Sequence, residues 1–170
     1  TKIGQGDFEA TIDLNQTTEY SRLSRAINAM SADLEDRIQL RRSLATAMEV
    51  QQNLLPRETP DLKGIEIAGK SNYCDQTGGD YFDFLDISGL SQNSAAIVIG
   101  DVMGHGIAAA MLMATARGIL RSRCTESGST GELLTHLNEL LVEVTEGHRF
   151  MTMIMATLDN TGRQFRWAGA

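Results

Sequence analysis

The first third of the chain has the apolar periodicity of a long helix. Between about Thr17 and Leu55 there is no proline or glycine, and apolar side chains recur with alternating spacings of four and three residues. The seam residues are Leu23, Ile27, Met30 and Leu34, followed in the same phase by Leu44, Met48, Gln51 and Leu55. This heptad pattern predicts one continuous helix of about 58 Å, at about 1.5 Å per residue.

The middle of this seam is polar. The heptad phase falls on Arg37 and Arg41, while the apolar residues Ile38 and Leu40 lie one step away from it. Two interpretations stay open: the guanidinium groups reach out of a locally loosened seam, or the helix has two competing registers. A single apolar stripe cannot fold alone, so we expect it to pair with a second copy in a parallel homodimer.

After Pro56 the pattern changes to short segments of strand character. They alternate apolar and polar residues or are rich in β-branched residues, which predicts strands at 64–70, 81–87, 95–101 and 151–159. Turn residues follow two of these strands, at 88–94 and 160–162. The last residues, 163–170, follow the second turn, and we expect them to lie at a sheet edge.

Two helices are predicted between the third and fourth of these strands. Ala, Met and Leu recur at helical spacing over 107–122. Ser129 and Glu132 form a capping box ahead of a second helical stretch at 133–144. Strands interrupted by a helix pair favour an α/β sandwich over a parallel doubly wound sheet.

Composition narrows the class of partner. With 170 residues, of which 42% are hydrophobic, the chain can bury a core. A net charge of −7 argues against nucleic acid as a partner, because nucleic-acid binders usually present a basic face. The two cysteines, Cys74 and Cys124, are too few for a disulfide framework and favour a reducing compartment. No apolar run approaches the roughly 20 residues of a membrane span.

Two aspartates stand at predicted strand ends and are candidate metal ligands. Asp80 follows two glycines, which let the backbone approach closely, and Asp101 ends an apolar strand ahead of a glycine-rich turn. Hard cations such as Mg²⁺ and Mn²⁺ prefer oxygen ligands, often one or two carboxylates. On motif chemistry alone the signal is weak, because a lone strand-end aspartate is also typical of a turn or helix cap.

Four motifs resemble the PPM-type serine/threonine phosphatases, in their bacterial SpoIIE/RsbU-like branch. They are LLP at 54–56, GGDYFD at 78–83, GDVMGHGIAAAMLMA at 100–114 and RFMTMIMATLD at 149–159, in the order of the family. The resemblance implies a four-layer αββα sandwich with two Mn²⁺ or Mg²⁺ ions between the sheets. By motif position Asp101 would bridge both ions, Asp80 would bind one of them, and the main-chain carbonyl of Val102 would add a ligand to the same ion.

This resemblance also implies an activity. A metal-activated water would hydrolyse phosphoserine or phosphothreonine in a protein, for which the family suggests an anti-sigma-factor antagonist of the STAS type. The family places another aspartate ligand and a further strand pair beyond Ala170, and the motif position of Asp159 does not match that ligand. We therefore expect these residues to hold about half of the site, and to be inactive by themselves.

A second resemblance concerns the start of the chain. Residues 2–30, including Gly6-Asp7-Phe8 and TEYSRL, resemble the second half of a HAMP signalling domain, although Tyr20 replaces the usual second acid. This implies a HAMP part at 1–35, a coiled-coil linker at 36–55 and a C-terminally incomplete phosphatase domain at 56–170. It also implies that the protein continues upstream into a sensor anchored in the inner membrane, with these residues on the cytoplasmic side.

Several alternatives stay open. Asp83 alternates onto the strand face of Tyr81, where it supports the candidate site or lies solvated. His105 fits a loop-positioning role better than ligation of a hard cation, and Cys74 is either oxidation-sensitive or inert. At the level of function, the alternatives are a non-catalytic dimeric signalling module with a degenerate phosphatase-like domain and, less favoured by the motifs, a HAMP-linked nucleotide cyclase.

Overall fold

The computed structural model describes residues 7–8, 11–13, 18–62, 64–72, 78–87, 94–124, 129–159 and 164–170. The chain forms two compact units, Thr1–Thr46 and Ala47–Ala170, each of which is described here by itself. Cys74, the expected turn at 160–162 and nearly all of the expected turn at 88–94 lie outside the described residues.

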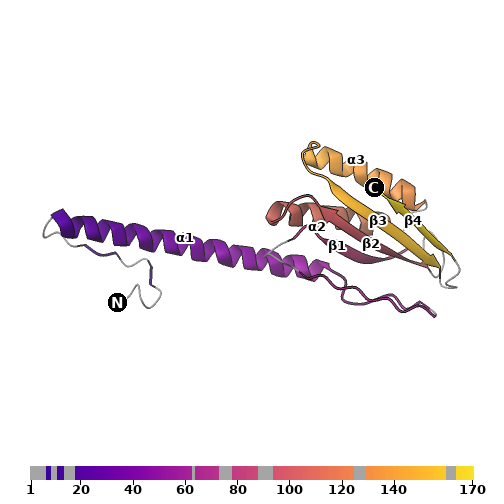
Figure 1. The fold of residues 1–170 in the computed structure, drawn as a ribbon, viewed down its shortest axis with the longest axis horizontal. Helices are drawn as coiled ribbons and strands as arrows, with labels where there is room; N and C mark the ends of the chain where they lie inside the picture. The colour runs from indigo at the N-terminus through magenta and orange to yellow at the C-terminus, as the bar shows by residue number, and fades with distance from the viewer. Residues whose placement is uncertain are drawn as a thin grey trace. The chain divides into compact units, whose positions relative to one another are not determined.

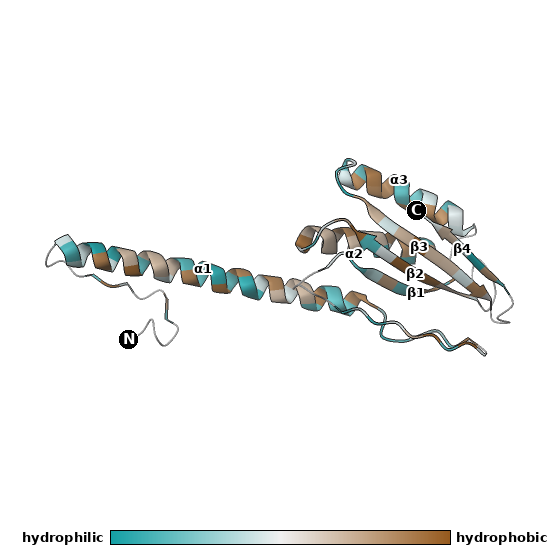
Figure 2. Ribbon diagram, viewed as in Figure 1, coloured by the Kyte–Doolittle hydropathy of each residue, from teal (hydrophilic) through white to brown (hydrophobic). Residues whose placement is uncertain are grey.

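The predicted long helix is confirmed as α1, Thr18–Leu54 (Figure 1). Along its length hydrophilic and hydrophobic residues alternate (Figure 2). Three of the predicted seam residues, Leu23, Met30 and Leu34, are exposed, as expected for a stripe that has no partner among the described residues of its unit. Pairing of this stripe in a coiled coil stays a prediction. No described helix combines the length and the apolarity that a membrane span requires.

Within the first unit, polar side chains of the helix make contacts that include the following pairs. The Asn28 side-chain amide donates to the Ile12 carbonyl and accepts from the Ile12 N–H, both at 2.9 Å. Arg37, one of the two seam arginines, forms an exposed ion pair with Asp33 at 2.8 Å. The HAMP resemblance stays a prediction.

The second unit contains one antiparallel sheet in the order β1-β2-β3-β4 (Figure 1). Its strands are β1, Tyr81–Asp86; β2, Ser94–Val102; β3, Met151–Asp159; and β4, Phe165–Gly169. The predictions of strands at 81–87, 95–101 and 151–159 are therefore confirmed to within a few residues. Because β4 pairs with β3 alone and β1 with β2 alone, these two strands form the edges of the sheet in the described chain.

Two helices cover one face of this sheet. They are α2, Ile107–Arg123, which packs against β1 and β2, and α3, Thr130–Thr145, which packs against β3 and β4. The capping box predicted for the second helix is present in full, with Ser129 and Glu132 bonded to each other's backbone N–H. The core lies between the two layers and includes Tyr81, Leu85, Val98, Met113, Leu120, Leu137 and Met155.

One expectation about the fold needs correction, and the complete αββα sandwich stays a prediction. The predicted strand at 64–70 is wrong over its described part: there is only an isolated bridge between Leu62 and Ile65. Its alternation reflects one-sided burial, whereas a strand also needs a hydrogen-bonded partner, which no other described segment supplies. The described residues form an α/β arrangement of one helix layer and one sheet, and the second sheet and second helix layer of an αββα sandwich are not among them.

Candidate functional site

Asp80 and Asp101 lie opposite each other on neighbouring strands. The register of β1 and β2 pairs Tyr81 with Gly100, and the Val102 N–H donates to the Gly79 carbonyl at 3.3 Å, which extends the pairing beyond the end of β1. Asp80 therefore faces Asp101 across the two strands, on the same side of the sheet. In such a pair the Cβ atoms are about 4.5–5.5 Å apart.

Gly79 brings the third predicted ligand into the same place. A Cβ atom at Gly79 would lie 2.6 Å from the Val102 carbonyl oxygen, so only glycine lets the backbone before Asp80 pass this close to it. The Val102 side chain is buried on the helix-covered face. The three predicted site residues, Asp80, Asp101 and Val102, therefore lie on two neighbouring segments at the same end of the sheet.

Both aspartates line a large cavity on the open face of the sheet. It has a volume of about 930 Å³, and its floor is largely apolar, with Phe82, Ile99, Ile154 and Trp167 among the lining residues. Lys70 and Thr152 share the lining, and Thr152 lies directly opposite Asp101 on β3. Neither residue can be identified from the sequence, because the β2–β3 register places Thr152 beside Asp101 and the path of a non-helical segment brings Lys70 to the cavity.

This donor set fits a hard divalent cation. Like charges directly opposite each other on neighbouring strands destabilise a sheet, and no hydrogen bond or ion pair involves the carboxylates of Asp80 and Asp101 within the described chain. A bound cation would remove that repulsion, and carboxylate and carbonyl oxygens are the donors that Mg²⁺ and Mn²⁺ prefer. Among the described residues, no group of three or more His, Cys, Asp or Glu side chains is arranged to hold a metal ion, so the protein donors found are two carboxylates and one carbonyl.

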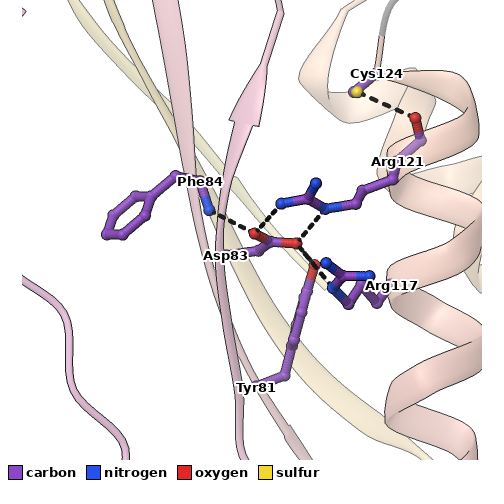
Figure 3. A network of polar contacts seen from close by, with 6 residues as sticks. All are labelled: Tyr81, Asp83, Phe84, Arg117, Arg121 and Cys124. Atoms are coloured by element: carbon purple, nitrogen blue, oxygen red, sulfur yellow. Dashed lines mark hydrogen bonds and ion pairs between the residues drawn. The ribbon is translucent and has the colours of Figure 1, made fainter. Parts of the chain in front are cut away.

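Asp83 lies on the opposite face of β1, fully buried against α2 (Figure 3). Arg121 donates from Nε to Oδ2 at 2.8 Å and from Nη2 to Oδ1 at 2.7 Å, a two-point pair. Tyr81 donates its hydroxyl at 3.2 Å, and the Phe84 N–H donates at 2.9 Å. The Arg117 Nε lies 3.3 Å from Oδ2, an ion pair without hydrogen-bond geometry. The prediction that Asp83 shares a face with Tyr81 is confirmed, and a solvated position for it is wrong.

The cluster shifts the pKa values of its members. Burial, reinforced by the charge of Asp83, raises the pKa of Tyr81 well above its ordinary value, so the phenol remains a donor at neutral pH. The hydrogen bonds to Asp83 raise the pKa of Arg121. Burial raises the pKa of the neighbouring Cys124 thiol, which indicates an unreactive side chain.

The end of α1 is hydrogen-bonded to the segment that precedes Asp80. Gln51, one of the predicted seam positions, is buried in the second unit, where its side-chain amide donates to the Gly78 carbonyl and accepts from the Gly78 N–H at 3.3 Å. His105 is exposed in the turn between β2 and α2. Its predicted role in loop positioning is not tested by this geometry.

The sequence comparisons agree with the motifs. Residues 91–170 match the protein family described as stage II sporulation protein E, SpoIIE. The chain is 28% identical over 132 residues to the phosphoserine phosphatase RsbU of Bacillus subtilis (strain 168), which covers 78% of this chain and 38% of RsbU. It is 30% identical over 131 residues to protein IcfG of Synechocystis sp., which covers 70% of this chain and 20% of IcfG.

The fold of the chain is similar to that of a solved PP2C domain. The SiaA-PP2C domain of Pseudomonas aeruginosa superimposes with a TM-score of 0.56 over 80% of this chain and 55% of that domain, at 16% identity. The predicted similarity to SpoIIE- and PPM-type phosphatase domains is therefore confirmed. This chain spans only 38% and 20% of the lengths of RsbU and IcfG.

Proposed function

We propose that this chain carries part of the metal site of a metal-dependent phosphoprotein phosphatase that hydrolyses phosphoserine or phosphothreonine. The observation that carries the proposal is the direct opposition of Asp80 and Asp101 across β1 and β2, with the Val102 carbonyl beside them. Two facing carboxylates without protein partners in the described chain are suited to share a cation. RsbU, to which this chain is similar, is named a phosphoserine phosphatase.

In this proposal each site residue has a separate role. Asp101 would lie between two ions, Asp80 would hold one of them, and the Val102 carbonyl would complete the protein ligands of that same ion. When bound, Mn²⁺ or Mg²⁺ supplies a Lewis acid that lowers the pKa of a water molecule and offsets phosphate charge. The protein itself supplies oxygen ligands fixed on the ends of rigid strands, and no side-chain nucleophile is required.

The phosphatase domain would form part of a larger signalling protein. We assign residues 56–170 to the phosphatase domain, 36–55 to a linker and 1–35 to the second half of a HAMP domain, in a sensor whose output acts on the cytoplasmic side of the inner membrane. The substrate would be a phosphoprotein such as a STAS-type anti-sigma-factor antagonist. The support for this setting is the motif order and the long helix α1 that leads to the domain.

A parallel homodimer through α1 belongs to the same proposal, because its apolar stripe is exposed. Replacing the two seam arginines in the full-length protein, Arg37→Leu with Arg41→Leu, should tighten the dimer, since apolar seam residues avoid the cost of burying guanidinium groups. Sedimentation equilibrium measures the dimer constant. A constant equal to that of the wild type would contradict the seam assignment.

We further propose that residues 1–170 alone do not catalyse turnover. Asp80, Asp101 and the Val102 carbonyl supply about one ion's protein ligands, and hydrolysis with two ions needs ligands for both. The exposed apolar side chains of the open face, including Ile99 and Trp167, support a need for further chain to cover it. Strong Mn²⁺-dependent turnover by residues 1–170 would contradict this expectation. It would mean that these residues also contain the ligands of the second ion.

The direct test of the function uses the full-length protein and a phosphoserine peptide. Phosphate release should require Mn²⁺ or Mg²⁺, and a chelator should abolish it. The same preparation should leave ATP and GTP unchanged, which separates a phosphatase from a nucleotide cyclase. No phosphate release from any phosphoserine or phosphothreonine substrate, at any divalent concentration, would favour the non-catalytic signalling module instead.

A further inference from the structure

The buried cluster around Asp83 takes no direct part in the proposed metal chemistry, yet it joins β1, which follows Asp80, to α2, which follows the turn after Val102 (Figure 3). Asp83 lies in the middle of β1, and its two guanidinium partners, Arg117 and Arg121, lie on α2. Both guanidinium groups belong to the same helix, so the cluster links one strand, β1, to one helix, α2.

The stability of the fold alone does not require this ion-pair cluster. Removing a carboxylate and a guanidinium from water costs free energy, and apolar residues of similar volume often stabilise a protein as well or better. The other buried residues of α2 are apolar and make non-directional contacts: Ala109, Leu112, Met113, Ala116 and Leu120. The two-point Arg121–Asp83 pair is directional, so it fixes how far α2 is rotated and shifted along β1.

The position of α2 is linked by short connections to the candidate metal ligands. Asp80 directly precedes β1, and α2 begins at Ile107, five residues after Val102 ends β2. Between Val102 and Ile107, Gly104 and Gly106 have φ values of 93° and 81°, and no side chain caps the start of α2. On its β2 side the turn is held by the Met103 N–H, which donates to the Phe150 carbonyl at 2.9 Å. On its α2 side no side chain caps it, so the placement of the helix determines where that half of the turn lies.

We propose, on the basis of the proposed function, that Asp83 and Arg121 are positioning residues for the metal site. The β1–β2 ladder sets the register of Asp80 and Asp101. By locking α2 against β1, the Asp83–Arg121 pair steadies the turn after β2 and so holds the Val102 carbonyl beside the two carboxylates. The affinity for a divalent cation then depends on a pair of residues that face away from the cation, on the other side of the sheet.

The test compares an apolar cluster with the native one in the full-length protein. The variant Tyr81→Phe/Asp83→Leu/Arg117→Met/Arg121→Met removes every charge and leaves no buried polar side chain of the cluster unpaired. Unfolding temperature is measured with a chelator, and the Mn²⁺ dissociation constant from the electron paramagnetic resonance of free Mn²⁺. We expect an unfolding temperature no lower than that of the wild type, and an affinity weaker by at least about tenfold.

Two further variants complete the experiment. Arg166→Met removes an exposed arginine whose guanidinium bonds to Gln164 on the other edge of the sheet, and it should change the Mn²⁺ affinity by less than about twofold. Asp83→Glu keeps the charge and moves the carboxylate by one methylene. It should fold and bind Mn²⁺ about threefold more weakly than the wild type.

Each outcome decides the proposal. Unchanged Mn²⁺ affinity in a folded apolar variant would overturn the positioning role and leave the proposed function intact. If neither the apolar variant nor Asp83→Glu folds, the cluster is structural and the positioning role is overturned as well. If the wild type binds no Mn²⁺, or Asp101→Asn binds it equally well, the proposed function itself fails, and the positioning role fails with it.

Discussion

The two faces of the sheet treat the same side chain in opposite ways. Asp80 directly precedes β1 and Asp83 lies three residues later, in the middle of the strand, but Asp83 faces the helices and Asp80 faces the open cavity. Asp83 is fully buried and receives hydrogen bonds or ion pairs from Tyr81, Phe84, Arg117 and Arg121. The Asp80 carboxylate faces Asp101 and has no protein partner in the described chain. The protein neutralises one charge itself and leaves the other for a ligand.

The apolar residues repeat this contrast. On β2 and β3, Val98 and Met155 are fully buried against the helices, whereas Ile99 and Ile154, their immediate neighbours, are more than half exposed. The helix-covered face therefore provides the stability of the unit. The open face carries the candidate chemistry and exposes apolar surface that a monomeric protein rarely leaves uncovered.

The largest effect expected from this difference is on catalysis. In the full-length protein, Asp101→Asn should lower turnover of a phosphoserine substrate by about three orders of magnitude or more, a barrier increase of about 4 kcal/mol. The bridging charge is lost, while an exposed strand-end amide leaves the fold intact. Initial rates at saturating Mn²⁺ measure the effect, and circular dichroism checks the fold.

Asp61→Asn is the matched control for this prediction, because Asp61 is an exposed carboxylate in a loop away from the aspartate pair. It should retain wild-type turnover. If Asp101→Asn keeps activity within about tenfold of the wild type, Asp101 does not belong to the metal site.

The next effect concerns the other face. Asp83→Asn should lower the free energy of unfolding by about 3 kcal/mol, since removing one partner of a buried ion pair leaves the other uncompensated. We expect the lower end of the usual range of about 3–5 kcal/mol because the side chain of Arg121 is 44% exposed. Urea denaturation in the presence of a chelator measures the loss. If Asp101→Asn is destabilised as much as Asp83→Asn, the contrast between the two faces is wrong.

The sequence predicts features whose causes are local. The capping box of Ser129 and Glu132 depends on residues three apart, and the long helix depends on a heptad repeat, so both could be identified correctly. Strand alternation also placed Asp83 on the face of Tyr81. The strand at 64–70 failed for the complementary reason, because pairing depends on a distant partner that alternation does not reveal.

In the candidate site, too, some features have local causes in the sequence and others depend on distant residues. Two glycines before Asp80 and an apolar strand before Asp101 mark both residues in the sequence, but only the β1–β2 register shows that they face each other. The partners of Asp83 lie 34 and 38 residues later on α2, and Thr152 lies 51 residues beyond Asp101. No spacing in the sequence relates residues that lie so far apart. The ion cluster around Asp83, and the position of Thr152 beside Asp101, can therefore be seen only in the folded structure.

A smaller effect follows from the pKa of Tyr81. Burial and the charge of Asp83 raise that pKa in the folded protein above its ordinary value of 10.0, so folding favours the protonated phenol. This contribution to stability is fully present below about pH 10 and is lost as the pH rises through the folded pKa, with a slope of up to about 1.4 kcal/mol per pH unit. Between pH 10 and 11 the free energy of unfolding of Tyr81→Phe should fall less steeply than that of the wild type. Equal slopes would place the phenol in contact with solvent rather than with Asp83.

The smallest effect tests the repulsion between Asp80 and Asp101 directly. With a chelator present, Asp101→Asn should raise the free energy of unfolding by about 0.2–1 kcal/mol, because like charges directly opposite on neighbouring strands are destabilising. Asp80→Asn should give a similar gain. The double variant should gain little more than either single one, since either change alone removes the repulsion. Because both residues are exposed, the gain should shrink at 1 M salt, where the screening length is about 3 Å. A metal-free Asp101→Asn protein that is less stable than the wild type at low salt would mean that the carboxylate already has a favourable partner in the protein, and the open face would then differ less from the helix-covered face than the register of β1 and β2 indicates.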